Sequence, residues 1–332
     1  MEINGRRIGD GFPTYFIAEA GLNHNGDIEI AKKIINAAKN AGANAIKFQT
    51  FQTEKFVTRK NQYFDIFKNA ELSYSEFDEL NKYSKEQNIT FFSAPFDLES
   101  AEYLNKIDVP CFKIASSDLT NIPLITKVAK MQKPMIISTG VSTMKEVEDA
   151  VNICYLQGNH KISLLHCIAS YPTPYDQVNL TAITTMKKQF NHPVGYSDNG
   201  EPLLVDLAAV SIGANIIEKH FTLDKNMEGP DHSFSIDPPG LTELISQIHM
   251  IDKMKGNGQK LPQPSEISSK SALRKSLTTK SDLKAGDVLT HEKILIKRPE
   301  GGIEPKYFDR VVGRKINKDI PEDSLIYWKD LD

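Results

Sequence analysis

The chain has 332 residues, 40% of them hydrophobic and 25% charged, which is typical of a globular protein with room for one large domain and one small one. Forty basic side chains stand against forty-three acidic ones, and this net charge of -3 argues against nucleic acid as a partner and favours a small ligand. Neither a secretory leader pattern nor an apolar run near the roughly eighteen residues of a membrane span is present, and the three widely spaced cysteines fit reduced thiols, so we expect a cytoplasmic protein.

Short apolar runs alternate with longer amphipathic ones between Tyr15 and His220, the pattern of repeated strand-helix units in a parallel sheet. Eight such runs predict strands, and several of them are rich in Ile, Phe and Val, as strands covered on both faces require. These runs are 15–20, 45–49, 90–94, 111–114, 135–138, 162–166, 194–196 and 216–220. Apolar residues at helical spacing recur between them, as in 31–38. The pattern favours an α/β fold that closes as a (β/α)8 TIM barrel, with a doubly wound open sheet as the alternative.

Two stretches depart from this alternation. Residues 51–72 are too many for an ordinary loop after a strand, which predicts a functional excursion over the barrel mouth. After a last helix near 241–254, the Gly, Pro and Gln content of 256–272 predicts a linker. We therefore expect a barrel domain over residues 1–255 and a small domain with short strands and turns over 273–332.

Polar residues at the carboxyl ends of the strands can be considered together, because those ends face the active site of a TIM barrel. They are Glu19, Asn23, His24, Lys47, Gln49, Ser93, Asp97, Lys113, Ser116, Asp118, Ser138, Thr139, His166, Ser197, Asp198, Asn199, Glu218 and His220. The two lysines and the hydroxyls suit an anionic, phosphorylated ligand. Each lysine could instead simply pair with Glu19 or Glu218, and His220 could be a core histidine rather than a ligand or an acid-base group.

Two motifs outside the strands add to this set. Residues 170–174 contain two prolines that hold the chain extended, so they can place the Tyr171 hydroxyl over a site or form a rigid loop without chemistry. Residues 229–232 follow the last strand and add a turn, Asp231 and an imidazole.

Taken in order, these motifs resemble the sialic acid synthase family over nearly the whole chain. The matching strings lie at 17–26 (IAEAGLNHNG), 47–50 (KFQT), 93–97 (SAPFD), 113–116 (KIAS), 138–140 (STG), 171–174 (YPTP), 195–198 (GYSD), 218–222 (EKHFT) and 229–232 (GPDH). The tail resembles the antifreeze-like (SAF) domain of that family through residues 297–299 (KRP) and the pair Gly301-Gly302.

The resemblance implies a phosphoenolpyruvate-dependent transferase that forms a carbon-carbon bond. Phosphoenolpyruvate would condense with an N-acetylmannosamine-like sugar to give phosphate and a nine-carbon 3-deoxy-2-keto acid, either N-acetylneuraminate or a legionaminic or pseudaminic relative. Phosphoenolpyruvate would be held by Lys47, Lys113, Ser116, Ser138, Tyr171 and Ser197. The catalytic groups would be Glu19, Lys47, Lys113, Asp118 and His220.

The sugar hydroxyls would be bound by Glu19 and Asp231. Arg298 would reach across from the small domain of a partner chain to contact the acyl group, which implies a domain-swapped homodimer.

The resemblance also implies a divalent metal, Mn²⁺ or Mg²⁺. His220 matches one of two metal-binding histidines of the family, but Asn199 stands where the other would be and offers an amide oxygen as a weaker ligand. Asp118 stands where Glu is commoner and Ala169 where Ser, Thr or Asn is usual. Together these departures suggest a subfamily with an altered substrate.

Two other functions remain open from the sequence. A Schiff-base aldolase or lyase would use Lys47 or Lys113 as its nucleophile. A non-catalytic sugar-binding relic would bind ligand without releasing phosphate. The identity of the acylated sugar, and whether it carries a phosphate, is also left open.

Overall fold

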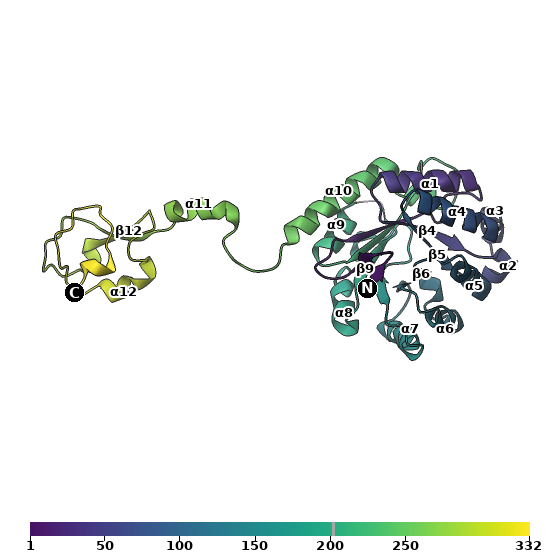
Figure 1. Cartoon of the computed structure of the whole chain (residues 1–332), viewed down its shortest axis with the longest axis horizontal. Coiled ribbons are helices and arrows are strands. Elements are labelled where there is room, and N and C mark those ends of the chain that lie inside the picture. The colour runs from purple at the N-terminus through teal and green to yellow at the C-terminus, as the bar shows by residue number, and fades with distance from the viewer. Residues whose placement is uncertain (201–202) are drawn as a thin grey trace. The chain divides into compact units, whose positions relative to one another are not determined.

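The computed structural model describes residues 1–200 and 203–332, which form two compact units, Met1–Asn257 and Gly258–Asp332. The first unit is a closed barrel of eight parallel strands in sequence order from β3 to β10, with β10 pairing back onto β3 (Figure 1). The TIM barrel expected from the alternation is confirmed, and the open doubly wound sheet is excluded.

Each predicted strand coincides with a barrel strand. The strands are β3 (Tyr15–Glu19), β4 (Ala45–Thr50), β5 (Thr90–Pro95), β6 (Phe112–Ile114), β7 (Met135–Ser138), β8 (Ile162–His166), β9 (Val194–Asp198) and β10 (Ile216–His220). They are buried along almost their whole length because helices cover the outside of the barrel and side chains fill its interior. At Gly195 the backbones of β9 and β10 approach so closely that any Cβ would collide with the Ile216 carbonyl oxygen.

Helices surround the strands, as Figure 1 shows. The outer helices are α1 (Ile28–Asn40), α4 (Tyr74–Glu86), α5 (Leu98–Lys106), α6 (Ile122–Lys130), α7 (Met144–Leu156), α8 (Thr181–Phe190), α9 (Leu203–Ser211) and α10 (Pro238–Lys255). The apolar stripe of α1 is buried, as its spacing predicts, and Asp27 caps the helix by accepting from two backbone N–H groups. A short hairpin, β1 (Glu2–Ile3) and β2 (Arg6–Arg7), precedes the barrel. In the described part of the chain, no helix combines the length and the apolar character needed to cross a membrane.

Residues 51–72, predicted as an excursion, contain the short helices α2 (Thr53–Phe56) and α3 (Phe64–Ala70). These helices share a small hydrophobic cluster of their own, separate from the barrel core. The cluster consists of Leu22, Phe51, Phe56, Phe67, Ala70 and Phe96. The excursion is therefore a packed element and not an extended loop.

The second unit has its own core, which includes Leu277, Leu289 and Ile326. Its regular elements are the antiparallel pair β11 (Ser276–Thr279) and β12 (Ile294–Lys297) and the helices α11 (Pro264–Leu273) and α12 (Phe308–Val311). Helix α11 has no buried residue and falls mostly within the stretch predicted as linker.

Candidate active site

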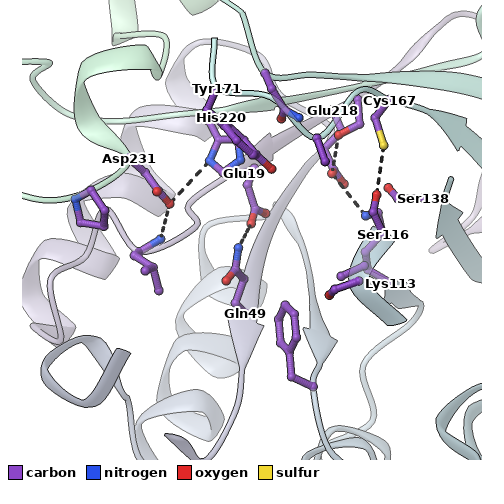
Figure 2. Close-up of a pocket in the computed structure, with 18 of the residues that line it drawn as sticks. Glu19, Gln49, Lys113, Ser116, Ser138, Cys167, Tyr171, Glu218, His220 and Asp231 are labelled. Atoms are coloured by element: carbon purple, nitrogen blue, oxygen red, sulfur yellow. Dashed lines mark hydrogen bonds and ion pairs between the residues drawn. The ribbon is translucent and has the colours of Figure 1, made fainter. Parts of the chain in front are cut away.

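A cavity of about 540 Å³ lies at the carboxyl ends of the barrel strands. Figure 2 shows side chains from several strands pointing into it. Parallel strands bring these residues together because the barrel aligns all their carboxyl ends on one face, although the residues are far apart in the sequence.

The floor of the cavity is a buried ionic cluster of Glu19, Lys47, Lys113 and Glu218. The Nζ of Lys47 is 2.9 Å from Glu19 Oε2 and 3.5 Å from Glu218 Oε1. The Nζ of Lys113 is 3.4 Å from the same Glu218 oxygen, which also accepts a hydrogen bond of 3.0 Å from Ser197. The lysines thus pair with carboxylates and line the cavity as well.

The two lysines differ in how well their charge is balanced. Burial is the largest influence on both and by itself lowers the pKa of a lysine. For Lys47 the carboxylates of Glu19 and Glu218 outweigh burial, so its pKa is raised. For Lys113 burial dominates, and the nearby charge of Lys47 adds to it, so its pKa is lowered despite Glu218. An anion bound beside Lys113 would stabilise its charged form.

The hydroxyl groups beside this cluster are partly unused. Among the described residues, the buried Ser138 Oγ has no hydrogen-bond partner. Ser116 Oγ accepts from the Gly140 N–H at 3.1 Å and lies 3.1 Å from Cys167 Sγ. A Cβ at Gly140 would stand 2.8 Å from Ser116 Oγ, so any other residue here would displace the Ser116 hydroxyl. A buried hydroxyl without a partner beside a cavity is a position where a polar ligand can complete the hydrogen bonding.

His220 and Asp231 form the opposite side of the cavity. The His220 Nδ1 is 3.9 Å from Asp231 Oδ2, which accepts a hydrogen bond of 3.2 Å from the Leu22 N–H. The His220 ring also lies edge-on to Tyr171 and Phe234, with centroid distances of 5.9 and 5.2 Å. At that distance the carboxylate does not hydrogen-bond to the ring, and among the described residues the buried Nδ1 has no hydrogen-bond partner, so the ring is open to a ligand.

A second buried ionic group supports the end of β9. Lys219 pairs with Asp198 and, at 3.0 Å, with Asp206, and donates to the Gly200 carbonyl at 2.7 Å. Burial opposes the charge on Lys219, but the two aspartates outweigh it and raise its pKa. The contacts of Lys219 with Asp198 and Gly200 hold the backbone on both sides of Asn199. The Nδ2 of Asn199 donates to the Ile168 carbonyl at 2.7 Å.

The donors for a metal ion are few. In residues 1–200 and 203–332, no three His, Cys, Asp or Glu side chains form a group suited to a metal. The Asn199 amide nitrogen is committed to Ile168, so its oxygen is the atom available as a ligand. The imidazole of His220 and Oδ1 of Asn199 therefore fit a weakly held cation that accepts oxygen ligands, such as Mg²⁺ or Mn²⁺, with other ligands coming from substrate or water.

Most of the predicted site residues line the cavity. These are Glu19, Lys47, Lys113, Ser116, Ser138, Tyr171, Ser197, Asn199, His220 and Asp231. Asp118 does not line it. Its carboxylate accepts from Ser117 and Asn121, and burial raises its pKa. Arg298 follows β12 in the second unit, so its role stays a prediction.

Several other strand-end polar residues serve the fold. Asn23 donates to the Phe221 carbonyl and to Ser235, and Asp97 caps α5 by accepting from the Ser100 N–H. His24 is buried outside the cavity lining, and burial lowers its pKa to about 4. The position at a strand end therefore does not by itself mark a residue of the site.

Two lining residues belong to the strand-end set of the sequence analysis but received no binding or catalytic role there. Glu218 is one, although it lies two residues before His220 on β10, and the alternation of side chains along a strand puts both on the same side. Gln49 is another and donates to Glu19 Oε1 at 3.1 Å. The largest missed group is apolar and comprises Leu22, Phe56, Tyr63, Ile66, Phe67, Phe96 and Phe234. The aromatic spacing within 51–72 was the available signal for its main part.

Comparison with known proteins gives consistent matches over both units. Residues 34–260 match the NeuB family and residues 274–332 match the SAF domain. An uncharacterized protein of Methanocaldococcus jannaschii is 50% identical over 100% of this chain and 98% of its own. The N,N'-diacetyllegionaminic acid synthase of Campylobacter jejuni is 40% identical over 94% of this chain and 98% of its own. The crystal structure of N-acetylneuraminic acid synthetase from Leptospira borgpetersenii, in complex with citrate, superposes with a TM-score of 0.78 at 38% identity, covering 81% of this chain and 94% of that one.

Proposed function

This chain belongs to the NeuB family and carries a SAF domain, and we propose that it condenses phosphoenolpyruvate with an acylated amino sugar of the N-acetylmannosamine type. The products would be phosphate and a nine-carbon 3-deoxy-2-keto acid such as N-acetylneuraminate or a legionaminic or pseudaminic relative. The observation that carries the proposal is the cavity floor, where Lys47 and Lys113 lie buried beside the unpartnered hydroxyl of Ser138.

The floor suits phosphoenolpyruvate because that molecule carries its carboxylate and its phosphate on the same carbon, C2. Lys47 and Lys113 would bind these two groups, and the hydroxyls of Ser116 and Ser138 would donate to their oxygens. The Ser197 hydroxyl would do so by exchanging its hydrogen bond to Glu218 for one to the ligand. In a buried site such preorganised donors stabilise charge much more strongly than they do in water. The lowered pKa of Lys113 is consistent with a position that lacks negative charge until the anion binds.

In the proposed reaction, C3 of phosphoenolpyruvate forms a bond to the aldehyde carbon of the open-chain sugar. Water adds at C2, the bond from C2 to the phosphate oxygen breaks, and phosphate leaves. The water oxygen becomes the keto oxygen, one of its protons ends on the new hydroxyl and the other on phosphate. The chain would contribute positioning and charge stabilisation, with no covalent bond to the protein.

The side with Glu19 and Asp231 would bind the sugar. Both carboxylates line the cavity and can accept hydrogen bonds from hydroxyls. Asp231 also lies near His220, with 3.9 Å between its Oδ2 and the Nδ1 of the ring. His220 and Asn199 would hold a divalent cation, and such an ion, when bound, polarises a carbonyl group.

Arg298 is proposed to contact the acyl group from the small domain of a partner chain, in a domain-swapped homodimer. A cytoplasmic location is likewise a proposal. Both rest on the resemblance to the family and on the sequence.

The direct test is phosphate release from phosphoenolpyruvate with a panel of N-acetylmannosamine-type sugars, with and without added manganese. Release that depends on the sugar is the expected result. Binding of the sugar without phosphate release under every condition would instead support the non-catalytic relic.

A Schiff-base aldolase is the second candidate, because the lowered pKa of buried Lys113 is also what a nucleophilic lysine requires. That reaction forms an imine between Lys113 and a carbonyl substrate, whereas the synthase reaction forms none. Borohydride treatment with substrate should leave the mass of the protein unchanged, and a trapped adduct on Lys113 would favour the aldolase.

A further inference from the structure

We propose that the sugar is uncharged and apolar at the end remote from its aldehyde, as in a 2,4-diacylamino-2,4,6-trideoxy hexose, and is not a hexose 6-phosphate. This inference rests on the proposed function and specifies its substrate. It follows from two features of the same cavity. The excursion 51–72 contributes an apolar wall, and both lysines of the floor, Lys47 and Lys113, already pair with carboxylates.

The apolar wall consists of Phe56, Tyr63, Ile66, Phe67 and Phe96, all of which line the cavity. The first four come from the excursion 51–72, and Phe96 follows β5 directly. Tyr63 is 51% exposed and Ile66 is 39% exposed, which are high values for large apolar side chains. Apolar surface that stays open inside a pocket indicates contact with a ligand.

Internal packing explains only part of the wall. Phe56 packs between Phe67 and Phe96, with ring centroids 4.8 and 4.4 Å apart. Tyr63 and Ile66 do not belong to this cluster. Packing within the excursion therefore does not explain why these two cavity-lining residues stay exposed, and a ligand would supply the missing contacts.

The wall is a preformed surface. Glu71 ties the two ends of the excursion together by accepting from the Thr53 N–H at 2.9 Å and from its hydroxyl at 2.6 Å. Asp97 adds a link by accepting from the Gln52 N–H at 3.3 Å. Because these contacts join α2, α3 and the end of β5, Ile66 and Tyr63 are presented without folding of the segment on the ligand.

The position of the wall decides which part of the sugar meets it. The aldehyde must reach C3 of phosphoenolpyruvate, which the lysines would hold at the floor. The other carbons of the open chain then extend toward the mouth of the cavity. The wall belongs to segments that follow the carboxyl ends of β4 and β5, so it lies on the mouth side. The end of the sugar around C4 to C6 is therefore the part that contacts the wall.

The charges of the cavity argue against a phosphate at that end. Lys47 and Lys113 are the only Lys or Arg residues among the described residues that line it, and both pair with carboxylates on the floor. They stand against three acidic lining residues, Glu19, Glu218 and Asp231. Arg298 is proposed to contact the acyl group, and the described lining offers no further cation to a phosphate near the wall, so burying a phosphate there is unfavourable. A methyl group at C6 and an acylamino group at C4 would instead bury apolar surface.

The test compares kcat/KM for phosphate release with three sugars: 2,4-diacetamido-2,4,6-trideoxymannose, N-acetylmannosamine and N-acetylmannosamine 6-phosphate. We expect the trideoxy sugar to exceed N-acetylmannosamine by about tenfold or more, the discrimination that an apolar pocket gives for small apolar groups. The 6-phosphate should be the poorest substrate. A 6-phosphate that is the best substrate, or equal values for the first two sugars, would overturn the inference and leave the proposed function intact. No release with any sugar would overturn both.

A substitution in the wall gives a second test. Ile66→Lys places a cation on the wall, so it should lower kcat/KM for the trideoxy sugar by about tenfold and raise it for the 6-phosphate. Gln62→Lys is the matched control, because Gln62 is an exposed excursion residue outside the cavity lining. The control should leave the order and the values of the three sugars unchanged. Equal effects of the two variants would contradict a wall that contacts the sugar.

Discussion

The floor and the apolar wall of the cavity are built in opposite ways. The floor consists of charged groups at strand ends, all of them buried and paired within a few ångströms. The wall consists of partly exposed apolar side chains on an inserted segment. The barrel fixes the floor, which is proposed to bind phosphoenolpyruvate, the substrate common to reactions of this type. The wall lies on an insertion and is proposed to bind the sugar, the substrate that differs between them. Changes to the floor should lower the rate equally for every sugar, and changes to the wall should alter the ranking of sugars.

Lys113→Ala should have the largest effect. It removes one cation from the proposed phosphoenolpyruvate site and leaves Glu218 with less compensation. Phosphate release should fall by about 10²–10³-fold for each sugar, the loss seen when one charge-stabilising group is removed. Lys127→Ala, at a half-exposed lysine on α6 that pairs with Glu102, is the control and should retain activity. If Lys113→Ala changed the ranking of the sugars, the claim that the floor acts equally on every sugar would be wrong.

Asn199→His should tighten manganese binding by about tenfold, equivalent to about 1.4 kcal/mol, because an imidazole nitrogen is a stronger ligand than an amide oxygen. Titration of metal-stripped protein measures this directly, and His220→Asn in the same background should abolish the gain. Unchanged affinity in Asn199→His would show that this side chain does not face the metal position.

Ser138→Ala should raise the KM for phosphoenolpyruvate by about tenfold, since a hydrogen bond to a charged group contributes about 1.5–3 kcal/mol. The free protein should keep or gain stability in a thermal melt, because the buried hydroxyl has no partner among the described residues. Ser163→Ala on β8 is the matched control. The Ser163 hydroxyl is also buried without a partner among the described residues, but Ser163 lies outside the cavity lining. It should show the same stability trend with an unchanged KM, and equal KM effects would rule out a role of Ser138 in binding.

Arg298→Ala should raise the KM for the sugar about fivefold and change the KM for phosphoenolpyruvate little. A fivefold change corresponds to the loss of about one ordinary hydrogen bond. Arg310→Ala, at another exposed arginine of the second unit, serves as the control. The reverse pattern, with phosphoenolpyruvate affected more than the sugar, would count against the swapped arrangement.

The pH dependence should show the smallest effect. In the proposed site phosphoenolpyruvate should bind best to protonated lysines, and the pKa of free Lys113 is lowered by burial. With rising pH, kcat/KM should therefore fall as Lys113 loses its proton, at a pH below the ordinary value of a lysine. Bound phosphoenolpyruvate stabilises the proton, so kcat should fall only at a higher pH. Coincident declines in the two profiles would exclude Lys113 as the titrating group.

The sequence predicts the floor well for a physical reason. Strands covered on both faces leave a strong apolar signal, and closure of the barrel then dictates that residues such as Lys47, Lys113 and His220 meet. The same rule predicts too many site residues. Asp97 and Asn23 also follow strands, but Asp97 caps a helix and Asn23 stabilises a loop. Asp118 shows a further limit, since a short helical turn after β6 directs its carboxylate to Asn121.

The wall could not be predicted in the same way. The length of 51–72 indicates an excursion, but its packing depends on Phe96 and Leu22, which are distant in the sequence. Aromatic residues in such a segment are equally compatible with a buried core, and only the exposure of Tyr63 and Ile66 in the folded chain separates the two interpretations.

The most direct test of the central claim uses phosphoenolpyruvate labelled with ¹⁸O at the oxygen that bridges C2 and phosphorus. We predict that phosphate is released only when an acylated amino sugar is present, that this phosphate carries the label, and that the nine-carbon keto acid does not. Release without sugar, no release with any sugar, or label retained in the keto acid would contradict the account.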